Sequence, residues 1–185
     1  VEHWAAVQPA KPFFIEKDCQ YTYEAICRQM KAYARQFQGL PRNTLLIVRQ
    51  DPVEQLIAFL GAETAGWVPV LGHPDLSPAA ADQLCRVRQI GWIDDGTLRK
   101  GNPEAPVPAP EVCMGVLSSG STGLPKLMFR TYESWAGFIP AQNRAFQIDR
   151  DTLAFVEGSM SFTGNLSVWS SVVYAGGTLL IGTTL

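Results

Sequence analysis

The residues best suited to chemistry form a loop rich in glycine and hydroxyl side chains at residues 118–126. Its two glycines, three positions apart, let the backbone turn tightly and bring consecutive N–H groups to one side, where they can hold an anion. The hydroxyl groups add donors for phosphate oxygens, and Lys126 adds a positive charge. The candidate phosphate-binding residues are Ser118, Ser119, Gly120, Ser121, Thr122, Gly123 and Lys126. This pattern favours a polyphosphate site, although an exposed Gly/Ser turn between two strands would have the same composition and stays open as an alternative.

The loop differs from three better-known active-site loops. A Walker loop has the form GxxxxGK[ST], whereas Leu124 and Pro125 here separate the second glycine from the lysine. The sequence contains neither the dinucleotide-binding GxGxxG pattern nor the GxSxG turn of serine hydrolases. A P-loop NTPase is therefore the hypothesis that we rank last, and no residue is assigned a catalytic role.

The overall charge excludes partners that need a strong electrostatic field. The 185 residues carry 15 Lys+Arg and 17 Asp+Glu, with a net charge of −2. This balance provides neither a basic nucleic-acid footprint nor a polybasic membrane patch. The four cysteines include no CxxC pair, which is typical of reduced thiols and predicts a cytoplasmic protein. With His3 and His73 as the only histidines, a histidine-rich metal site is not expected.

Charge is also unevenly distributed along the chain. Charged residues make up 17% of the sequence, against about 25% in typical soluble domains, and residues 158–185 contain none. Serines, threonines and the pair Gly176-Gly177 interrupt this segment, so it lacks the roughly 20 apolar residues of a membrane-spanning helix. We expect it to be buried within a domain larger than this chain. The surface left by such a truncation would favour self-association.

The elements that must position the loop alternate between helical and buried-strand patterns. Apolar residues at helical spacing, with capping residues, predict helices over residues 22–38, 51–66, 77–91, 132–146 and 164–174. Apolar runs predict strands at residues 45–48, 67–71, 92–93, 112–117, 127–130, 152–156 and 178–181. This alternation predicts an α/β fold with layered αβα architecture and a largely parallel sheet.

A proline-rich stretch at residues 94–110 divides the predicted fold. Residues 1–93 form a first α/β subregion, and residues 111–185 form the subregion that carries the loop. Asp94 and Asp95 precede a glycine inside the link. We expect an exposed turn there rather than a pair of catalytic carboxylates.

Several segments resemble one enzyme superfamily. Residues 116–126, ending in Gly123-Leu124-Pro125-Lys126, are similar to the signature phosphate loop of the AMP-forming acyl-adenylate synthetases. That superfamily includes acyl-CoA ligases, adenylation domains of peptide synthetases and beetle luciferases. Supporting similarity is found at residues 23–38, 61–70, 161–162 and 174–178, so the resemblance covers nearly the whole chain. It implies the N-terminal part of the adenylate-forming fold.

The chain departs from the superfamily pattern at informative positions. Leu127 stands where members usually have glycine, and Arg130 begins a stretch where many have a histidine. Amino-acid-activating members carry an aspartate after the phenylalanine that corresponds to Phe162, but this chain has Thr163. A threonine supplies no countercharge to a buried ammonium group, which favours a fatty or aryl acid; an alignment shifted by one residue stays open. Phe162, Thr163 and Gly164 are the candidate acyl-pocket residues.

The resemblance implies a two-step reaction. A carboxylic acid reacts with ATP and Mg²⁺ to give acyl-AMP and pyrophosphate, and coenzyme A or a carrier phosphopantetheine then displaces AMP. The superfamily's adenine-stacking segment, ribose-binding aspartate, hinge and C-terminal lysine lie further along its chain. We therefore expect an N-terminal fragment of an acid–thiol ligase that is inactive alone. The alternative is a freestanding nucleotide- or anion-binding module without ligase activity.

Overall fold

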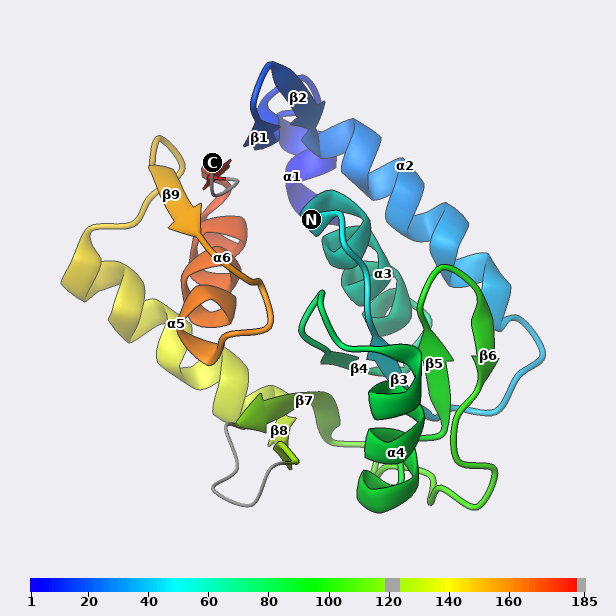
Figure 1. Ribbon diagram of the computed structural model, residues 1–185. Coiled ribbons are helices and arrows are strands. Elements are labelled where there is room, and N and C mark those ends of the chain that lie inside the picture. Colours follow the sequence, from blue (N-terminus) through cyan, green and yellow to red (C-terminus); the bar gives the residue numbers. More distant parts are fainter. Residues whose placement is uncertain (119–123, 183–185) are drawn as a thin grey trace. The chain divides into compact units, whose positions relative to one another are not determined.

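The computed structural model describes residues 1–118 and 124–182 as a mixed α/β chain (Figure 1). The strands are β1 (Pro12–Glu16), β2 (Cys19–Thr22), β3 (Thr44–Ile47), β4 (Val68–Leu71), β5 (Trp92–Asp94), β6 (Leu98–Lys100), β7 (Val112–Ser118), β8 (Lys126–Thr131), β9 (Leu153–Glu157) and β10 (Thr178–Gly182). The helices are α1 (Glu2–Val7), α2 (Tyr23–Ala34), α3 (Pro52–Thr64), α4 (Pro78–Arg88), α5 (Tyr132–Phe146) and α6 (Thr163–Ala175), with a short 3-10 helix at Arg35–Phe37. The predicted α/β class is confirmed.

The chain forms two compact units, which are described separately. One contains Val1–Gln29 and Glu133–Leu185, and the other contains Met30–Tyr132. The three-part division at residues 93 and 110 stays a prediction.

The unit of residues 30–132 is built on a six-stranded sheet with the order β6-β5-β3-β4-β7-β8. Its four central strands run parallel, and β6 and β8 pair antiparallel at the two edges. Every residue of β3 and β4 is buried, because a central parallel strand is covered on both faces. That burial explains the continuous apolar runs in the sequence. The three-residue strand β6 was not predicted, since Leu98-Arg99-Lys100 has no apolar alternation.

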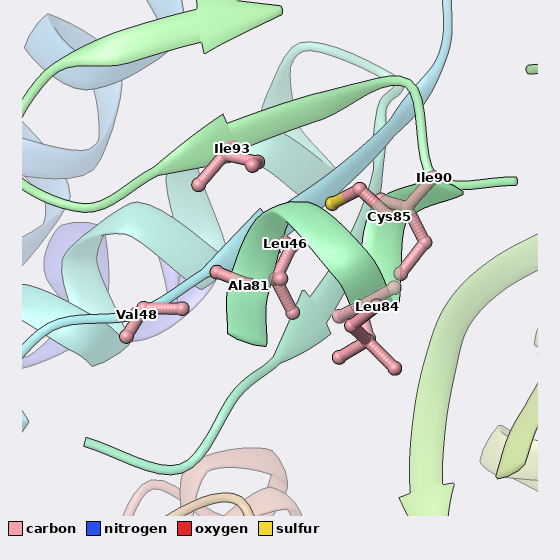
Figure 2. Packing of buried hydrophobic residues seen from close by; sticks show 8 residues of the cluster. Leu46, Val48, Ala81, Leu84, Cys85, Ile90 and Ile93 are labelled. Atoms are coloured by element: carbon pink, nitrogen blue, oxygen red, sulfur yellow. The ribbon is translucent and has the colours of Figure 1, made fainter. Parts of the chain in front are cut away.

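Helix α4 is joined to this sheet by a buried apolar cluster (Figure 2). Ser77 begins the helix by accepting a hydrogen bond from the Ala80 N–H, and Pro78 occupies the first turn. The cluster consists of Leu46, Val48, Val70, Ala81, Leu84, Cys85, Ile90 and Ile93. Leu117 and Leu127, which flank the candidate phosphate loop, pack against it. Both ends of the loop therefore rest on the core of this unit.

The prediction of an exposed turn at Asp94-Asp95 is wrong for Asp94. Asp94 is the last residue of β5 and is 1% exposed. Arg49 donates to its two carboxylate oxygens at 2.6 and 3.0 Å, and the Tyr33 hydroxyl donates at 2.5 Å. Asp95 is partly buried and accepts two hydrogen bonds from Arg99. A carboxylate can be buried here because a guanidinium group neutralises it and its oxygens are hydrogen-bonded.

The other unit contains a four-stranded sheet with the order β2-β1-β10-β9. Strand β10 runs parallel to both β1 and β9, so the sheet joins the two ends of the described chain. Phe13 and Phe14 of β1 are fully buried, whereas no residue of β2 is. Strands β1 and β2 were not predicted, because a strand of four or five residues has little local signature in the sequence.

Helix α6 makes up much of the segment that lacks charge, and six of its 13 residues are buried. The buried residues of α6 are Leu166, Trp169, Ser170, Ser171, Val172 and Val173. Neutral hydrogen bonds satisfy its serines: Ser170 Oγ accepts from Trp135 Nε1 at 3.3 Å and donates to the Leu166 carbonyl at 2.7 Å. Ser171 Oγ accepts from Gln142 at 3.0 Å. Among the described residues, none of the helices has the length and apolar character needed to cross a bilayer.

Candidate phosphate-binding site

The antiparallel pair β7–β8 brings the two ends of the candidate loop together. Leu117 pairs with Leu127, and Ser118 pairs with Lys126 at the point where the strands meet the loop. The Lys126 side chain is exposed, and Ser118 is partly buried. Residues 119–123, which complete the predicted phosphate-binding set, lie outside the described residues. Of that set, the structure places Ser118 and Lys126 side by side.

Gly115 permits the close packing of β7 between its neighbours. A Cβ atom at this position would lie 2.7 Å from Leu127 Cδ1 and 2.7 Å from Val70 Cγ2. Those distances are far below van der Waals contact, so any larger residue would force the Leu127 and Val70 side chains to shift. A glycine in the middle of a strand is therefore explained by this close approach.

The loop begins on the side of the sheet where the parallel strands have their carboxyl ends. Strands β3, β4 and β7 run in the same direction, and Ser118 is the last residue of β7. Two amide side chains fix the connection between β4 and α4. Gln50 donates to the Pro74 carbonyl at 2.6 Å, and Gln55 donates to the Gly72 carbonyl at 3.0 Å. Ligands of open α/β sheets bind outside the carboxyl ends of strands, which is the edge that carries the candidate loop.

Three basic side chains of this unit differ in how they are paired. Arg49 is neutralised by Asp94, as described above. Arg88, at the end of α4, donates from Nε to the Pro125 carbonyl at 2.7 Å and from Nη2 to the Leu124 carbonyl at 3.4 Å. Within residues 1–118 and 124–182, no carboxylate forms an ion pair with Arg88 or Lys126. The charge of the exposed Lys126 is thus available to an anion, whereas the donors of Arg88 are directed at the two carbonyls.

The two buried cysteines of this unit are not nucleophiles. Burial raises the pKa of the Cys85 thiol to about 12 and is the main cause that raises the pKa of Cys113 to about 11. The Cys113 thiol also donates to the Arg130 carbonyl at 3.3 Å. Both thiols therefore stay protonated at neutral pH and act as small apolar groups.

The described residues contain no cluster of three or more His, Cys, Asp or Glu side chains that could hold a metal ion.

The candidate acyl-pocket residues lie in the other unit, at the beginning of α6. Phe162 precedes the helix and is 61% exposed, and Thr163 and Gly164 form its first turn. Asn165 donates to the Glu157 and Ser159 carbonyls at 2.9 Å each and so fixes the approach to the helix. A Cβ atom at Gly164 would meet no atom within 4 Å. The three residues are thus adjacent, exposed in part, and unconstrained by packing at the glycine.

Sequence reasoning missed Arg88. Its only local signal is a basic residue in the last turn of a helix, which is the usual position for one. The contact that matters joins it to residues 36 and 37 positions away, and no pattern in the sequence reveals that separation.

Comparison with curated proteins gives one weak similarity, and no protein-family model matches the chain. VraA, a candidate long chain fatty acid-CoA ligase of Staphylococcus epidermidis, is 21% identical over 160 residues. The match includes 83% of this chain and 35% of VraA. The chain therefore spans about a third of the length of this relative.

Solved structures share the fold over the whole chain. The N-terminal subdomain of Klebsiella oxytoca NpsA, in complex with 3-hydroxyanthranilyl-AMSN, gives a TM-score of 0.79 at 17% identity, with 100% of this chain and 52% of that chain covered. The o-succinylbenzoate CoA synthetase (MenE) of Bacillus subtilis, in complex with the acyl-adenylate intermediate OSB-AMP, gives 0.78 at 17% identity, with coverage of 100% and 55%. The chain thus has the N-terminal fold of adenylate-forming enzymes and spans about half of each neighbour.

Proposed function

We propose that the chain is the N-terminal part of an ATP-dependent, AMP-forming acid–thiol ligase. The observation that carries the proposal is the β7–β8 hairpin at the carboxyl edge of the parallel sheet. It joins Ser118 to Lys126 across a loop whose sequence resembles the phosphate loop of these enzymes, within a fold that NpsA and MenE share along the entire chain.

In this proposal the loop binds the β- and γ-phosphates of ATP. A carboxylate oxygen of the acid forms a bond to the α-phosphorus, and the bond from that phosphorus to pyrophosphate breaks. Backbone N–H groups and hydroxyls of residues 118–123 stabilise the negative charge that develops on the leaving pyrophosphate, and Lys126 adds a full positive charge. Mg²⁺ enters with ATP. A thiol, either coenzyme A or a carrier phosphopantetheine, then displaces AMP from the acyl-adenylate.

The proposed substrate is a fatty or aryl acid without an α-amino group. Phe162, Thr163 and Gly164 would line the acyl site, and none of them carries a charge. An α-ammonium group moved from water to such surroundings would lose hydration without gaining a counterion. The names of VraA, a candidate long chain fatty acid-CoA ligase, and of MenE, an o-succinylbenzoate CoA synthetase, agree with an acid that has no α-amino group.

The activity belongs in this proposal to a longer protein. The chain spans about a third of VraA and about half of MenE, so the remainder of such an enzyme would supply the adenine and ribose contacts. We expect the isolated chain to bind the triphosphate without catalysing adenylation. Location in the cytoplasm and self-association of the isolated chain remain predictions.

Replacing Lys126 tests the phosphate site. Lys126→Ala removes one charge-assisted contact, so ATP should bind about tenfold more weakly, while the weaker binding of AMP should change little. Because the side chain is exposed, the free energy of unfolding should change by less than about 0.5 kcal/mol. Isothermal titration calorimetry measures the affinities for ATP and for AMP. Lys100→Ala, which removes an exposed lysine from β6, is the matched control.

Pyrophosphate exchange distinguishes the ligase from the freestanding module. The isolated chain should show no acid-dependent ATP–pyrophosphate exchange with a panel of fatty, aryl and amino acids. A longer native chain that continues past residue 185 should exchange with fatty or aryl acids and not with amino acids. Exchange by the isolated chain would contradict its expected inactivity, and a longer chain that binds ATP but never exchanges would favour the binding module.

A further inference from the structure

Arg88 contacts the exit of the candidate phosphate loop through two successive carbonyl groups. Its guanidinium donates to the Pro125 carbonyl at 2.7 Å and to the Leu124 carbonyl at 3.4 Å. These residues directly precede Lys126. Pro125 has no N–H, so its carbonyl is the one backbone group through which the protein can hold that residue by a hydrogen bond. A planar guanidinium group that reaches both oxygens restrains the orientation of this part of the backbone.

Arg88 is itself held on a rigid support. It is the last residue of α4, and the following Gln89 adopts a left-handed conformation with φ of 55° that ends the helix. Leu84 and Cys85, one turn earlier, belong to the buried cluster against which Leu117 and Leu127 pack. Helix α4 therefore contacts both sides of the loop: apolar side chains hold the strand ends, and Arg88 holds the exit.

The hydrogen bonds of Arg88 distinguish it from an ordinary phosphate ligand. Its donors are directed at backbone carbonyls, whereas Lys126 is exposed and forms no ion pair with a carboxylate of the described residues. A lysine at position 88 would keep the charge but would lack the planar pair of donors. Orientation and charge can therefore be separated by experiment.

We propose that Arg88 is a positioning residue for polyphosphate binding: it fixes the Leu124-Pro125 backbone so that Lys126 is held in place to meet the phosphates. The inference rests on the proposed phosphate site. It adds a residue from helix α4 that does not itself touch the ligand, and it predicts that backbone order at the loop exit limits affinity.

The test uses the 185-residue chain with inorganic tripolyphosphate as the probe, because this ligand needs no adenine contacts. Arg88→Gln and Arg88→Lys are compared with Arg86→Gln, which removes an exposed arginine from the same end of α4. Both Arg88 variants should bind tripolyphosphate roughly tenfold more weakly, and Arg86→Gln should bind like the parent chain. Because Arg88 makes no phosphate contact, its variants should keep the parent's salt dependence, whereas Lys126→Ala should show a weaker one.

Hydrogen exchange provides a readout that does not require a ligand. The amides of Leu124, Lys126 and Leu127 should exchange several-fold faster in both Arg88 variants than in the parent chain, while exchange within β3 and β4 should stay unchanged. The unchanged core exchange also establishes that each variant is folded. If Arg88→Gln fails this criterion, Arg88→Lys alone carries the comparison.

The outcomes separate this inference from the proposed function. Parent-like affinity in Arg88→Lys would show that charge suffices and would overturn the inference, as would a reduced salt dependence in Arg88→Gln, which would make Arg88 a direct ligand. If the parent chain does not bind tripolyphosphate, the proposed phosphate site is wrong. Exchange at residues 124–127 then decides whether Arg88 restrains the loop exit, and unchanged exchange would overturn that as well.

Discussion

The unit of residues 30–132 buries a carboxylate, whereas the buried polar side chains described in the other unit are neutral. In the unit of residues 30–132, Asp94 is buried as an ion that Arg49 and Tyr33 hold. In the other unit, Ser170 and Ser171 of α6 are buried with neutral hydrogen bonds. Removal of one member of a buried ion pair leaves an uncompensated charge, whereas removal of a hydroxyl leaves at most a neutral donor unsatisfied. Removal of the Asp94 carboxylate should therefore affect stability far more than removal of either serine hydroxyl.

Asp94→Ala should have the largest effect on stability. The substitution removes the acceptor of the Tyr33 hydroxyl and leaves the Arg49 guanidinium with the longer contact to Glu54 at 3.4 Å, which should cost about 3–5 kcal/mol. Chemical denaturation of the parent and variant chains measures the difference. Hydrogen exchange resolved by peptide should assign the loss to β3 and β5 rather than to α6.

Two further variants control for charge alone. Asp95→Ala removes a partly exposed carboxylate from the Arg99 ion pair and should cost less than about 1 kcal/mol. Asp94→Ala combined with Arg49→Met removes both ions and should recover part of the loss. Equal costs for Asp94→Ala and Asp95→Ala would show that Asp94 is not held as a buried ion.

Tyr33 should make the same unit sensitive to alkaline pH. Burial, together with the charge of Asp94, raises the pKa of the Tyr33 hydroxyl far above its ordinary value. An unfolded tyrosine ionises near pH 10, so above that pH the unfolded chain binds fewer protons than the folded chain and stability falls as pH rises. The contribution of the protonated Tyr33 hydroxyl to the free energy of unfolding is fully present below about pH 10. Above that pH it decreases by up to roughly 1.4 kcal/mol per pH unit.

Tyr33→Phe removes this titration. The variant should lose about 1.5–3 kcal/mol at pH 8, because Asp94 loses a donor, but its stability should fall less steeply than that of the parent between pH 10 and 11. Tyr23, whose pKa burial also raises, is present in both proteins and cancels in the comparison. Denaturation curves at several pH values test the prediction, and parallel losses in the two proteins would contradict it.

The comparison also shows which features local sequence can predict. Strands β3 and β4 are predictable because burial on both faces requires a continuous apolar run. The charge-free segment reveals the burial of α6 for a similar reason. Asp94 looks like part of a turn because Asp-Asp-Gly is a turn sequence, and the residue that permits its burial, Arg49, lies 45 positions earlier. Pairing between distant residues leaves no local pattern.

Local sequence likewise predicts one part of the candidate site and not the other. The loop is recognisable in the sequence because its glycine and hydroxyl residues are themselves the groups that would bind a phosphate. The support of the loop is not recognisable, because Gly115 and Arg88 act through residues that are distant in sequence: Val70 and Leu127 for the glycine, and the carbonyls at the loop exit for the arginine. The sequence therefore predicts the groups that would meet the phosphates better than it predicts the groups that hold them.

Ser171→Ala should have the smallest effect and sharpens the contrast between the units. The Ser171 hydroxyl is fully buried and accepts from Gln142 Nε2 at 3.0 Å, but the same amide also donates to the Ser167 carbonyl at 3.2 Å. The donor therefore keeps one acceptor when the hydroxyl is removed, and alanine favours the helix over serine. We expect a cost of about 1 kcal/mol or less.

A double-mutant cycle with Gln142→Ala determines whether the hydrogen bond itself contributes. The coupling energy between Ser171 and Gln142 should be no more than about 1 kcal/mol, well below the coupling between Asp94 and Arg49 measured by the same method. A loss above 3 kcal/mol in Ser171→Ala would mean that α6 depends on a single polar contact as strongly as β5 does. The difference between the units would then come from packing around these residues and not from the charge of the group that is buried.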